Sequence, residues 1–520
     1  MRLRTGAVST IVAGAVGVLF AAAPAFVLWR AVRLGGLDGS LLDELRAPLW
    51  RTLQLAVLVS ATCVVVGTGL AWLVTRTDLP LRRLLRTLLV LPLVIPSFVG
   101  AAALASGLAP GGVLRAALGL VGVEAPRRVR GLLPAWLVLS SISYPYVLLP
   151  VAARLQTMRA ELDETARLLG CSSTSTFLRV TLPQLRSAML AGGLLVFLYS
   201  VSEFGAVQLL GYDTLTRVIY ATRQLDRATS FGAASLVLAL ALAVVVAARR
   251  TVRGDIGELR RQVRALRPVP LRRLRIPAFL ASMSVLAIGL LAPVMGLGGW
   301  AWRGIVDDRI DVASLARPAW NTAATALVTA VVAVLVVLPV AWGAVRRPNL
   351  ITSGASVSVI GGFALPGIVV ALALAVLTLN TPALASLYQT MPLLLGAYVI
   401  HFGSQALAGT EQAVRAVSAE VRSSALLLEP SAWRRLARVD APLMRPGLLA
   451  GGGLVMLATL KDLPSTLLLA PIGFRTLATE IWGSFEEGFY ADAAVAAIIL
   501  VAMSAVLTWF LVVRARPSRA

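Results

Sequence analysis

Long apolar segments recur along the whole chain and constrain its fold more than any other feature. Hydrophobic residues make up 58% of the 520 residues and charged residues only 14%. A helix needs about twenty apolar residues to cross the hydrocarbon core of a bilayer, where backbone groups find no water. By that rule we expect about twelve spans, near 7–28, 52–75, 85–108, 132–153, 188–210, 230–248, 277–299, 319–343, 353–379, 387–408, 447–470 and 490–513. The sequence predicts an all-α polytopic membrane protein in a lipid bilayer, with 353–379 long enough to be broken or tilted.

The distribution of arginine indicates how these segments are oriented. A formal net charge of +23 would suggest nucleic acid as the partner of a soluble protein. Here the arginines gather in alternate loops, namely at 2–4, 76–86, 154–167, 249–275, 346–347, 434–438 and 514–519. The intervening loops also carry acids, such as Asp38, Asp43 and Asp307. This positive-inside pattern favours a membrane protein over a nucleic-acid binder and predicts that both termini are cytoplasmic.

The chain also repeats itself. One offset pairs Trp72 with Trp342, Thr52 with Thr322, Arg76 with Arg346 and Pro96 with Pro366. A slightly different offset pairs Pro183 with Pro442, the glycines at 192–193 with those at 451–452, and Glu203 with Asp462. We therefore expect two homologous six-helix halves in parallel orientation, 1–250 and 277–520. The arginine-rich segment 251–276 between them, which contains two prolines, is expected to be a cytoplasmic linker.

A polar segment interrupts the apolar runs between residues 154 and 183. Apolar residues of 154–169 recur at helical spacing, and Gly170 can adopt the left-handed conformation that ends a helix. Ser172 or Ser173 can then cap a second short helix, which Pro183 ends. The pattern predicts a helix-turn-helix at the membrane surface. Its apolar residues, among them Leu168 and Leu169, need cover from lipid or a partner protein.

A second copy of this segment lies at the equivalent place in the repeat. Ser431 takes the capping position, and Glu429 followed by Pro430 stands where Gly170 stands in the first copy. A single copy is equally consistent with a solvated helical loop. Two aligned copies favour two docking sites for a partner.

The first segment resembles the EAA loop of binding-protein-dependent ABC importers. Its matching positions are Glu164, Ala166, Gly170, Val180, Leu182 and Pro183, and Phe177 lies on the same second helix. In that family the loop is the coupling helix that seats in a cleft of the ATPase. The resemblance covers nearly the whole chain and implies a type I ABC importer permease of a bacterial inner membrane. Its implied partners are two ABC ATPase subunits and an extracytoplasmic substrate-binding protein.

The second copy departs from the family pattern at Ser423, Glu429 and Ala441. Its expected coupling residues are Ser423, Ala425, Glu429, Trp433, Val439 and Pro442. The resemblance implies that this copy also docks an ATPase, with a contact that is weaker or differently shaped.

The chain does not carry the sequence of an ATPase. A phosphate-binding loop ends in Gly-Lys-Ser/Thr, whereas the only lysine, Lys461, lies between Leu460 and Asp462. We therefore expect a transport subunit that is not an enzyme and holds no cofactor of its own, with ATP hydrolysed by a partner.

Two carboxylates occupy equivalent positions inside apolar segments. Glu203 and Asp462 each follow a glycine pair by the same interval, and an unpaired carboxylate in a membrane costs a few kcal/mol. One hypothesis is a translocation path with a transient metal site formed by these acids, since their oxygens suit hard cations. The alternative is structural, with Lys461 neutralising one acid or the pair holding a gate closed.

The residues at 202–205, 461–469 and 473–478 look most like those of fused, double-length ferric-iron importers. This resemblance implies iron as the substrate, with a polyamine, thiamine or an aminophosphonate as alternatives. An ion-coupled secondary transporter that uses Glu203 and Asp462 is a rival from another class. A membrane scaffold without transport would leave those acids unexplained.

Overall fold

The chain folds almost entirely into helices. The computed structural model describes residues 2–120, 122–126, 128–158, 165, 168–170, 172–252, 269–307, 311–429 and 431–514. Over these residues the β-structure is limited to an isolated bridge between Thr77 and Val269. Nine of the described helices are long and apolar enough to span a membrane, and three bent pairs raise the number to as many as 12. The prediction of an all-α polytopic fold with about twelve spans is confirmed.

The helices of the first part of the chain are α1 (Arg2–Arg33), α2 (Gly39–Arg76), α3 (Arg82–Leu88), η1 (Leu91–Val94), α4 (Ser97–Leu108), α5 (Val113–Leu120), α6 (Leu132–Ser143), α7 (Pro145–Thr157), α9 (Ser173–Thr176), η2 (Phe177–Thr181), α10 (Leu182–Gln184), α11 (Arg186–Ser202), α12 (Gly205–Leu209), α13 (Leu215–Thr222) and α14 (Arg227–Val252). Those of the second part are η3 (Arg272–Leu274), α15 (Arg275–Leu286), η4 (Ala287–Leu291), α16 (Ala292–Val306), η5 (Val312–Leu315), α17 (Ala316–Arg346), α18 (Leu350–Ala364), α19 (Gly367–Asn380), η6 (Pro382–Leu387), α20 (Met391–Ala416), α21 (Ala419–Leu428), α22 (Ala432–Arg435), η7 (Leu436–Asp440), α23 (Ala441–Leu460), α24 (Pro464–Leu469), α25 (Leu477–Glu486) and α26 (Tyr490–Arg514).

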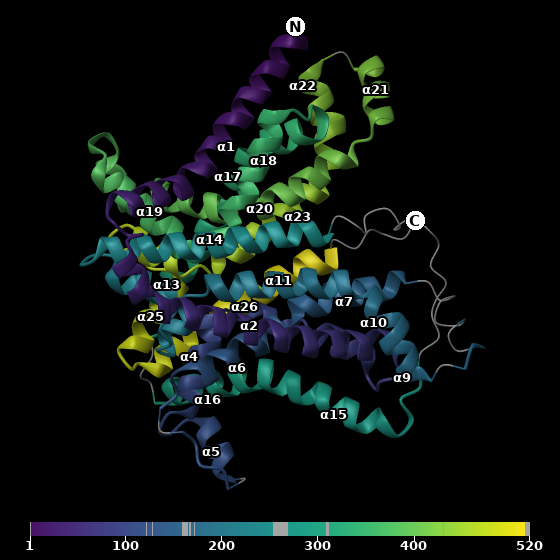
Figure 1. Ribbon diagram of the computed structural model, residues 1–520, viewed down its shortest axis with the longest axis vertical. Helices are drawn as coiled ribbons and strands as arrows, with labels where there is room; N and C mark the ends of the chain where they lie inside the picture. The colour runs from purple at the N-terminus through teal and green to yellow at the C-terminus, as the bar shows by residue number, and fades with distance from the viewer. Residues whose placement is uncertain are drawn as a thin grey trace. The chain divides into compact units, whose positions relative to one another are not determined.

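These helices pack into two compact units (Figure 1). The N-terminal unit comprises residues 43–218 and 239–309, and the C-terminal unit comprises 1–42, 219–238 and 310–520. The units differ from the halves expected from the repeat, 1–250 and 277–520, because the helices that begin each half pack in the unit formed mainly by the other half. The division of the sequence into halves and a linker at 251–276 stays a prediction.

Helix α1 belongs to the first half of the sequence but packs in the C-terminal unit. It packs against α17, α18 and α19. Its Phe20 is fully buried, and a Cβ built on Gly403 of α20 would lie 2.5 Å from that ring. Because Gly403 has no side chain, the surface of α20 leaves space at this position, and the ring of Phe20 packs there.

Helix α16 belongs to the second half of the sequence but packs in the N-terminal unit, where it lies along α4. The indole Nε1 of Trp300 donates a hydrogen bond of 2.9 Å to the carbonyl oxygen of Ser106 at the end of α4. The bond ties α16 to the last turn of α4, where the same carbonyl oxygen also accepts a hydrogen bond from the N–H of Ala109.

Two of the apolar runs are sharply bent at prolines that the repeat pairs with each other. The pair η1 and α4 is bent by 92° where Pro96 forms the N-cap of α4. The helices α18 and α19 are bent by 107°, and Pro366 is the N-cap of α19. Proline cannot donate the backbone hydrogen bond of a continuous helix, which explains both breaks. The expected break in the 353–379 run is confirmed.

Three other prolines follow a widened helical turn, and at the first of them, Pro183, the run is also bent by 58° between α10 and α11. The π-helical segments η2, η4 and η7 end two residues before Pro183, Pro293 and Pro442 respectively. A proline ring clashes with the carbonyl group four residues earlier, and a turn with hydrogen bonds to the fifth residue makes room for it. Segments η2 and η7 are equivalent under the repeat and lead from the two polar loops into α11 and α23.

Glycine allows adjacent helices to approach closely in both units. A Cβ on Gly192 of α11 would lie 2.8 Å from the Cα of Val147 in α7. In the C-terminal unit, a Cβ on Gly409 of α20 would lie 2.4 Å from the Cα of Gly451 in α23. Small residues at such contacts bring helix backbones together in a membrane. Gly192 and Gly451, paired by the repeat, thus both lie at close helix contacts.

We predict that Gly409→Ala destabilises the protein by about 1–3 kcal/mol, because the added methyl group has no space against α23. The measurement is the thermal unfolding midpoint of the purified chain in detergent. Gly396→Ala is the matched control on the same helix, since a Cβ there meets nothing within 4 Å. Equal midpoints for the two variants would contradict this packing.

Candidate coupling loops and intramembrane carboxylates

The first polar loop has the turn that its sequence predicts. Gly170 has a φ of 83°, and a Cβ there would meet no neighbouring atom, so conformation alone calls for glycine. Ser172 Oγ accepts a hydrogen bond of 3.2 Å from the backbone N–H of Ser175 and so caps α9. Glu164 and Ala166, two of the expected coupling residues, lie outside the described residues.

The remaining coupling residues of this loop lie on the path to α11. The ring of Phe177 packs edge-on against Trp72 of α2, with 5.2 Å between the ring centroids. Val180 and Leu182 are half-buried, and Pro183 is exposed. Phe177 therefore fixes the second helix of the loop to the membrane span α2.

The second loop keeps the same plan with different residues. Ser418 Oγ accepts a hydrogen bond of 3.3 Å from the N–H of Val421 and caps α21, and Ser431 Oγ accepts one of 3.5 Å from the N–H of Arg434. Hydrogen bonding with Ser418 lowers the pKa of Glu420. Glu429, in the place of Gly170, forms an ion pair of 3.7 Å with Arg438. The second loop thus has the ion pair of Glu429 at the position where the first loop has the turn at Gly170.

The other expected coupling residues of the second loop differ in exposure. Ser423 is exposed, whereas Ala425 is buried against the rest of the C-terminal unit. Val439 is half-buried and Pro442 is exposed. The backbone of Trp433 belongs to α22, and its side chain lies outside the described part of the structure.

The structure adds a contact that the sequence analysis did not recognise. The guanidinium carbon of Arg422 in α21 lies 4.7 Å from the ring centroid of Trp342 in α17. Arg346, one turn further along α17, donates a hydrogen bond of 2.7 Å to the carbonyl oxygen of Val414. Partial burial lowers the pKa of Arg422, and Asp440 opposes this shift. The repeat had paired Trp342 with Trp72, and both tryptophans hold a loop helix, although through different partners.

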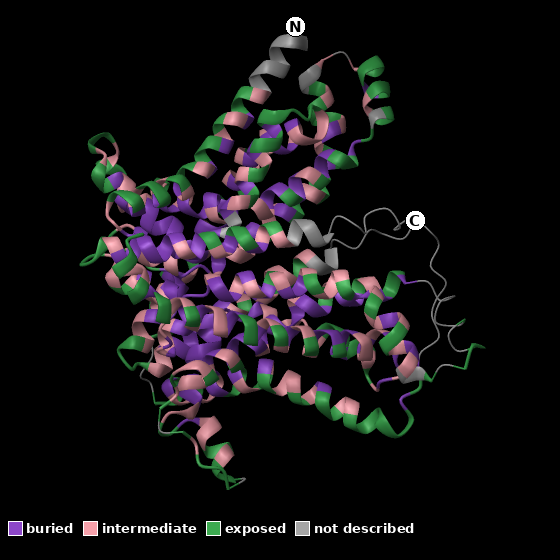
Figure 2. Cartoon of the chain, viewed as in Figure 1, coloured by how far each residue is buried: buried purple, intermediate pink, exposed green. Residues whose placement is uncertain are grey.

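Each loop presents a pair of leucines that nothing in the described structure covers. Leu168 and Leu169 are both at least 80% exposed, as are Leu427 and Leu428. The offset that pairs Pro183 with Pro442 also pairs these leucines. Figure 2 shows α21, which ends at Leu428, exposed over much of its length. Exposed apolar residues at equivalent places in two loops are typical of protein-binding sites.

The carboxylate of Glu203 holds together a break in an apolar run. Glu203 is only 6% exposed and lies between α11 and α12. Its Oε1 accepts hydrogen bonds of 2.8 Å from Ser97 Oγ and 2.9 Å from the N–H of Ala206, in the first turn of α12. Its carbonyl oxygen accepts a hydrogen bond from Thr216 Oγ1. The side chain therefore satisfies a helix N-terminus that water does not reach.

Asp462 has the same role in the C-terminal unit. It is 7% exposed, and its Oδ2 accepts a hydrogen bond of 3.0 Å from the N–H of Ser465 in the first turn of α24. Thr466 Oγ1 donates 3.1 Å to the Asp462 carbonyl oxygen, as Thr216 does to that of Glu203. Lys461 is the C-cap of α23. Both acids therefore cap a helix, which is a structural role that the sequence analysis did not predict, and neutralisation by Lys461 or a closed gate stays a hypothesis.

The described residues do not include a conventional metal site. No group of three or more histidine, cysteine, aspartate or glutamate side chains gathers in that part of the chain. A transient metal site on Glu203 and Asp462, and a translocation path along these residues and Lys461, stay hypotheses.

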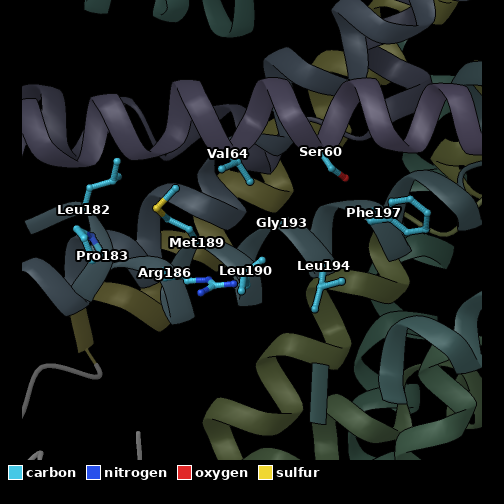
Figure 3. A pocket seen from close by; sticks show the side chains of 10 residues that line it. All are labelled: Ser60, Val64, Leu182, Pro183, Arg186, Met189, Leu190, Gly193, Leu194 and Phe197. Atoms are coloured by element: carbon cyan, nitrogen blue, oxygen red, sulfur yellow. The ribbon is translucent and has the colours of Figure 1, made fainter. Parts of the chain in front are cut away.

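A cavity of about 550 Å³ lies beside the end of the first loop (Figure 3). Its lining residues come from α2, α10 and α11 of the N-terminal unit and are Ser60, Val64, Leu182, Pro183, Arg186, Met189, Leu190, Gly193, Leu194 and Phe197. Leu182 and Pro183 belong to the expected coupling residues. A movement of the loop therefore changes the wall of this cavity directly.

Comparison with known proteins identifies the relatives of this chain. Residues 63–252 match the family described as "Binding-protein-dependent transport system inner membrane component". An Fe(3+)-transport system permease protein of Haemophilus influenzae is 26% identical over 476 residues, which cover 89% of each chain. A probable sulfate transport system permease protein of Nephroselmis olivacea is 30% identical over 38% of this chain and 71% of its own length. A molybdenum transport system permease protein of Mycobacterium tuberculosis is 30% identical over 39% of this chain and 75% of its own length.

We predict that Glu203→Leu lowers the stability of the purified chain by about 1–3 kcal/mol, because it leaves the Ser97 hydroxyl and the Ala206 N–H without an acceptor. Glu203→Gln keeps a carbonyl oxygen at this place and retains most of the stability. Thermal unfolding midpoints in detergent compare the two variants. Equal losses for leucine and glutamine would show that the cap does not matter.

Proposed function

The chain belongs to the family of binding-protein-dependent transport inner membrane components, and on that premise we propose that it is the double-length permease of an importer for ferric iron. Permeases of this family are the membrane components of ABC importers, which also contain an ATPase and a substrate-binding protein. Family membership decides against the ion-coupled secondary transporter considered from the sequence. The permease carries out no covalent chemistry in this proposal.

One observation supports iron above other cargoes. The similarity to the Fe(3+)-transport permease extends over 89% of both chains, so that protein shares the double length. The sulfate and molybdenum permeases align with less than half of this chain. An oxyanion importer is the second candidate, because those two relatives are the more identical over their shorter alignments.

The exposed leucine pairs support docking of the ATPase at both loops. Leu168 and Leu169 directly precede Gly170 in the first loop, and Leu427 and Leu428 end α21 in the second. In this proposal one ATPase subunit covers the leucine pair of each loop, so two ATPase subunits bind each chain. The coupling residues of the two loops, from Glu164 to Pro183 and from Ser423 to Pro442, then pass the closure of the ATPases to α11 and α23.

The position of the loops supports an orientation with both termini in the cytoplasm. In the C-terminal unit, the N-terminal end of α1 and the helices α21 and α22 lie at the same end (Figure 1). In the N-terminal unit, the arginine-rich segment 251–276 meets the end of α2 that carries Arg76. The contact is a hydrogen bond of 2.7 Å from the N–H of Val269 to the carbonyl oxygen of Arg76. An ATPase works in the cytoplasm, so both loops and the arginine-rich ends belong there.

We further propose that Glu203 and Asp462 contribute to the translocation path. Carboxylate oxygens suit a hard cation such as ferric iron. Each acid lies at a break in an apolar run, where a change in helix geometry alters its hydrogen bonds. This role is in addition to the helix caps that both side chains form.

We expect uptake of radiolabelled ferric iron by cells to be lost on deletion of this chain and restored on its return, provided that the ATPase partner is present. Parallel assays use sulfate, molybdate, a polyamine, thiamine and an aminophosphonate. Restoration of sulfate or molybdate uptake without iron uptake would replace iron with an oxyanion.

The matched variant for this assay is Glu203→Gln with Asp462→Asn. The amides keep oxygens for both helix caps but remove both negative charges, so we expect a membrane-inserted, folded chain that takes up iron at least tenfold more slowly. Normal uptake by this double variant would exclude the acids from the path and leave them with a structural role alone.

We predict that serine at Leu168 and Leu169, or at Leu427 and Leu428, reduces the amount of ATPase that purifies with the chain by roughly tenfold or more. Two leucines covered by a partner contribute several kcal/mol to binding, and 1.4 kcal/mol corresponds to a factor of about ten. Pull-down from detergent-solubilised membranes measures the ratio of the two proteins.

Leu225→Ser is the control for these variants. Leu225 is 95% exposed and lies in the turn before α14, outside both loops. Unchanged ATPase recovery with the serine pairs would show that the leucines serve another purpose, such as contact with lipid.

A further inference from the structure

A small polar cavity lies in the C-terminal unit, where α17, α20 and α23 approach the loop before α25. Its volume is about 10 Å³, enough for a single particle the size of a water molecule. The lining residues are Thr322, Thr325, Tyr398, Thr459, Leu460, Asp462 and Thr476. All seven are less than a tenth exposed, and six of them carry a side-chain oxygen.

Three of the four threonine hydroxyls that line the cavity have already donated their protons elsewhere. Thr322 Oγ1 donates 2.7 Å to the carbonyl oxygen of Pro318, and it accepts a hydrogen bond of 2.9 Å from the N–H of Leu477. Thr325 Oγ1 donates 2.6 Å to the carbonyl oxygen of Asn321. Thr459 Oγ1 donates 2.9 Å to the carbonyl oxygen of Val455. A hydroxyl has one proton and two lone pairs, so lone pairs are what these three residues retain.

Tyr398 and Asp462 also present hydrogen-bond acceptors to the cavity. Thr466 Oγ1 gives its proton to the Asp462 carbonyl oxygen, so the hydrogen bond of 2.6 Å between Tyr398 and Thr466 has the tyrosine hydroxyl as donor. The tyrosine oxygen therefore also retains lone pairs. Asp462 is an acceptor through both carboxylate oxygens when ionised. The cavity is thus lined by acceptors that surround a buried carboxylate.

The two equivalent carboxylates take their side-chain hydrogen bond from different serines, and Ser465 supplies the one to Asp462. Ser97 Oγ donates to Glu203 at 2.8 Å. The offset that pairs Pro96 with Pro366 also pairs Ser97 with Gly367, which has no hydroxyl. A Cβ on Gly367 would lie 3.2 Å from Asp462 Oδ1, so the backbone holds the same place beside the carboxylate. In the C-terminal unit the serine hydroxyl beside the acid therefore comes from α24, and the polar cavity lies on Asp462 as well.

We propose that this cavity binds a single dehydrated monovalent cation of the size of sodium, resident in the permease and distinct from its cargo. Oxygen ligands suit hard cations, and a positive charge offsets the cost of a buried carboxylate. The site has one carboxylate, whose negative charge balances that of a monovalent cation. Calcium takes six to eight oxygen ligands, commonly from several carboxylates. Lys461 precedes Asp462 but is not among the lining residues. The ion would join α17, α20 and α23 beside the break before α24.

The test uses the purified full-length chain in detergent, without ATPase or iron, so its result is independent of the transported substrate. Thermal unfolding is followed in sodium, potassium and choline chloride at equal ionic strength. We expect the unfolding midpoint to rise by several degrees with sodium in a saturable manner, and to change little with choline. Binding of radioactive sodium is expected to saturate at about one ion per chain.

Thr325→Val and Thr459→Val remove one ligand oxygen each at nearly constant volume and are expected to abolish the sodium-dependent rise. Thr410→Val is the matched control, because Thr410 is fully buried in α20, donates 2.7 Å to the carbonyl oxygen of Ala406 and lies outside the cavity. Equal midpoints in the three salts, with no sodium bound, would overturn the proposal and assign the cavity to water. A sodium effect that persists in both cavity variants would also overturn it.

Discussion

A helix that breaks inside a membrane leaves backbone N–H groups that water does not reach, and in this protein a carboxylate supplies the missing acceptor in each unit. Glu203 and Asp462 stand two residues before α12 and α24 and accept hydrogen bonds from the first turn of these helices. A hydroxyl from Thr216 or Thr466 then fixes the backbone of the acid itself. Without this arrangement, α11 and α23 would have to continue as straight spans or expose unsatisfied groups to lipid.

The coupling loops depend on a second constraint, the missing N–H of proline. Pro183 and Pro442 each follow a π-helical segment. After Pro442 the helix continues in α23, whereas after Pro183 the run bends by 58° before α11 begins. In the N-terminal unit the same proline and the adjacent Leu182 line a cavity of about 550 Å³. The first loop thus ends at residues that also line this cavity.

The sequence contained most of what determines individual helices and little of what determines their partners. Gly170, Ser172 and Ser431 act locally, and their turn and capping roles followed from residue type alone. The exchange of α1 and α16 between the units was not predictable from periodicity, because an apolar stripe does not specify which helix covers it. The contact between Trp342 and Arg422 was missed for a similar reason, although the pairing of Trp72 with Trp342 marked the position. The acids were singled out correctly as equivalent, but their capping role requires coordinates of α12 and α24.

Relatives that carry a metal cation and relatives that carry oxyanions share this family, so the fold by itself does not select the charge of the cargo. In this chain the carboxylate of Glu203 is already engaged by Ser97 and by the N-terminus of α12. A cation that uses Glu203 must therefore compete with those donors, and it gains access to the carboxylate when the break between α11 and α12 changes shape. Such a site binds weakly in one conformation and more strongly in another, which is what transport requires of a path, since tight binding in both would stop release. On the proposed path, the helix cap and the contact with the cation are then two states of the same side chain.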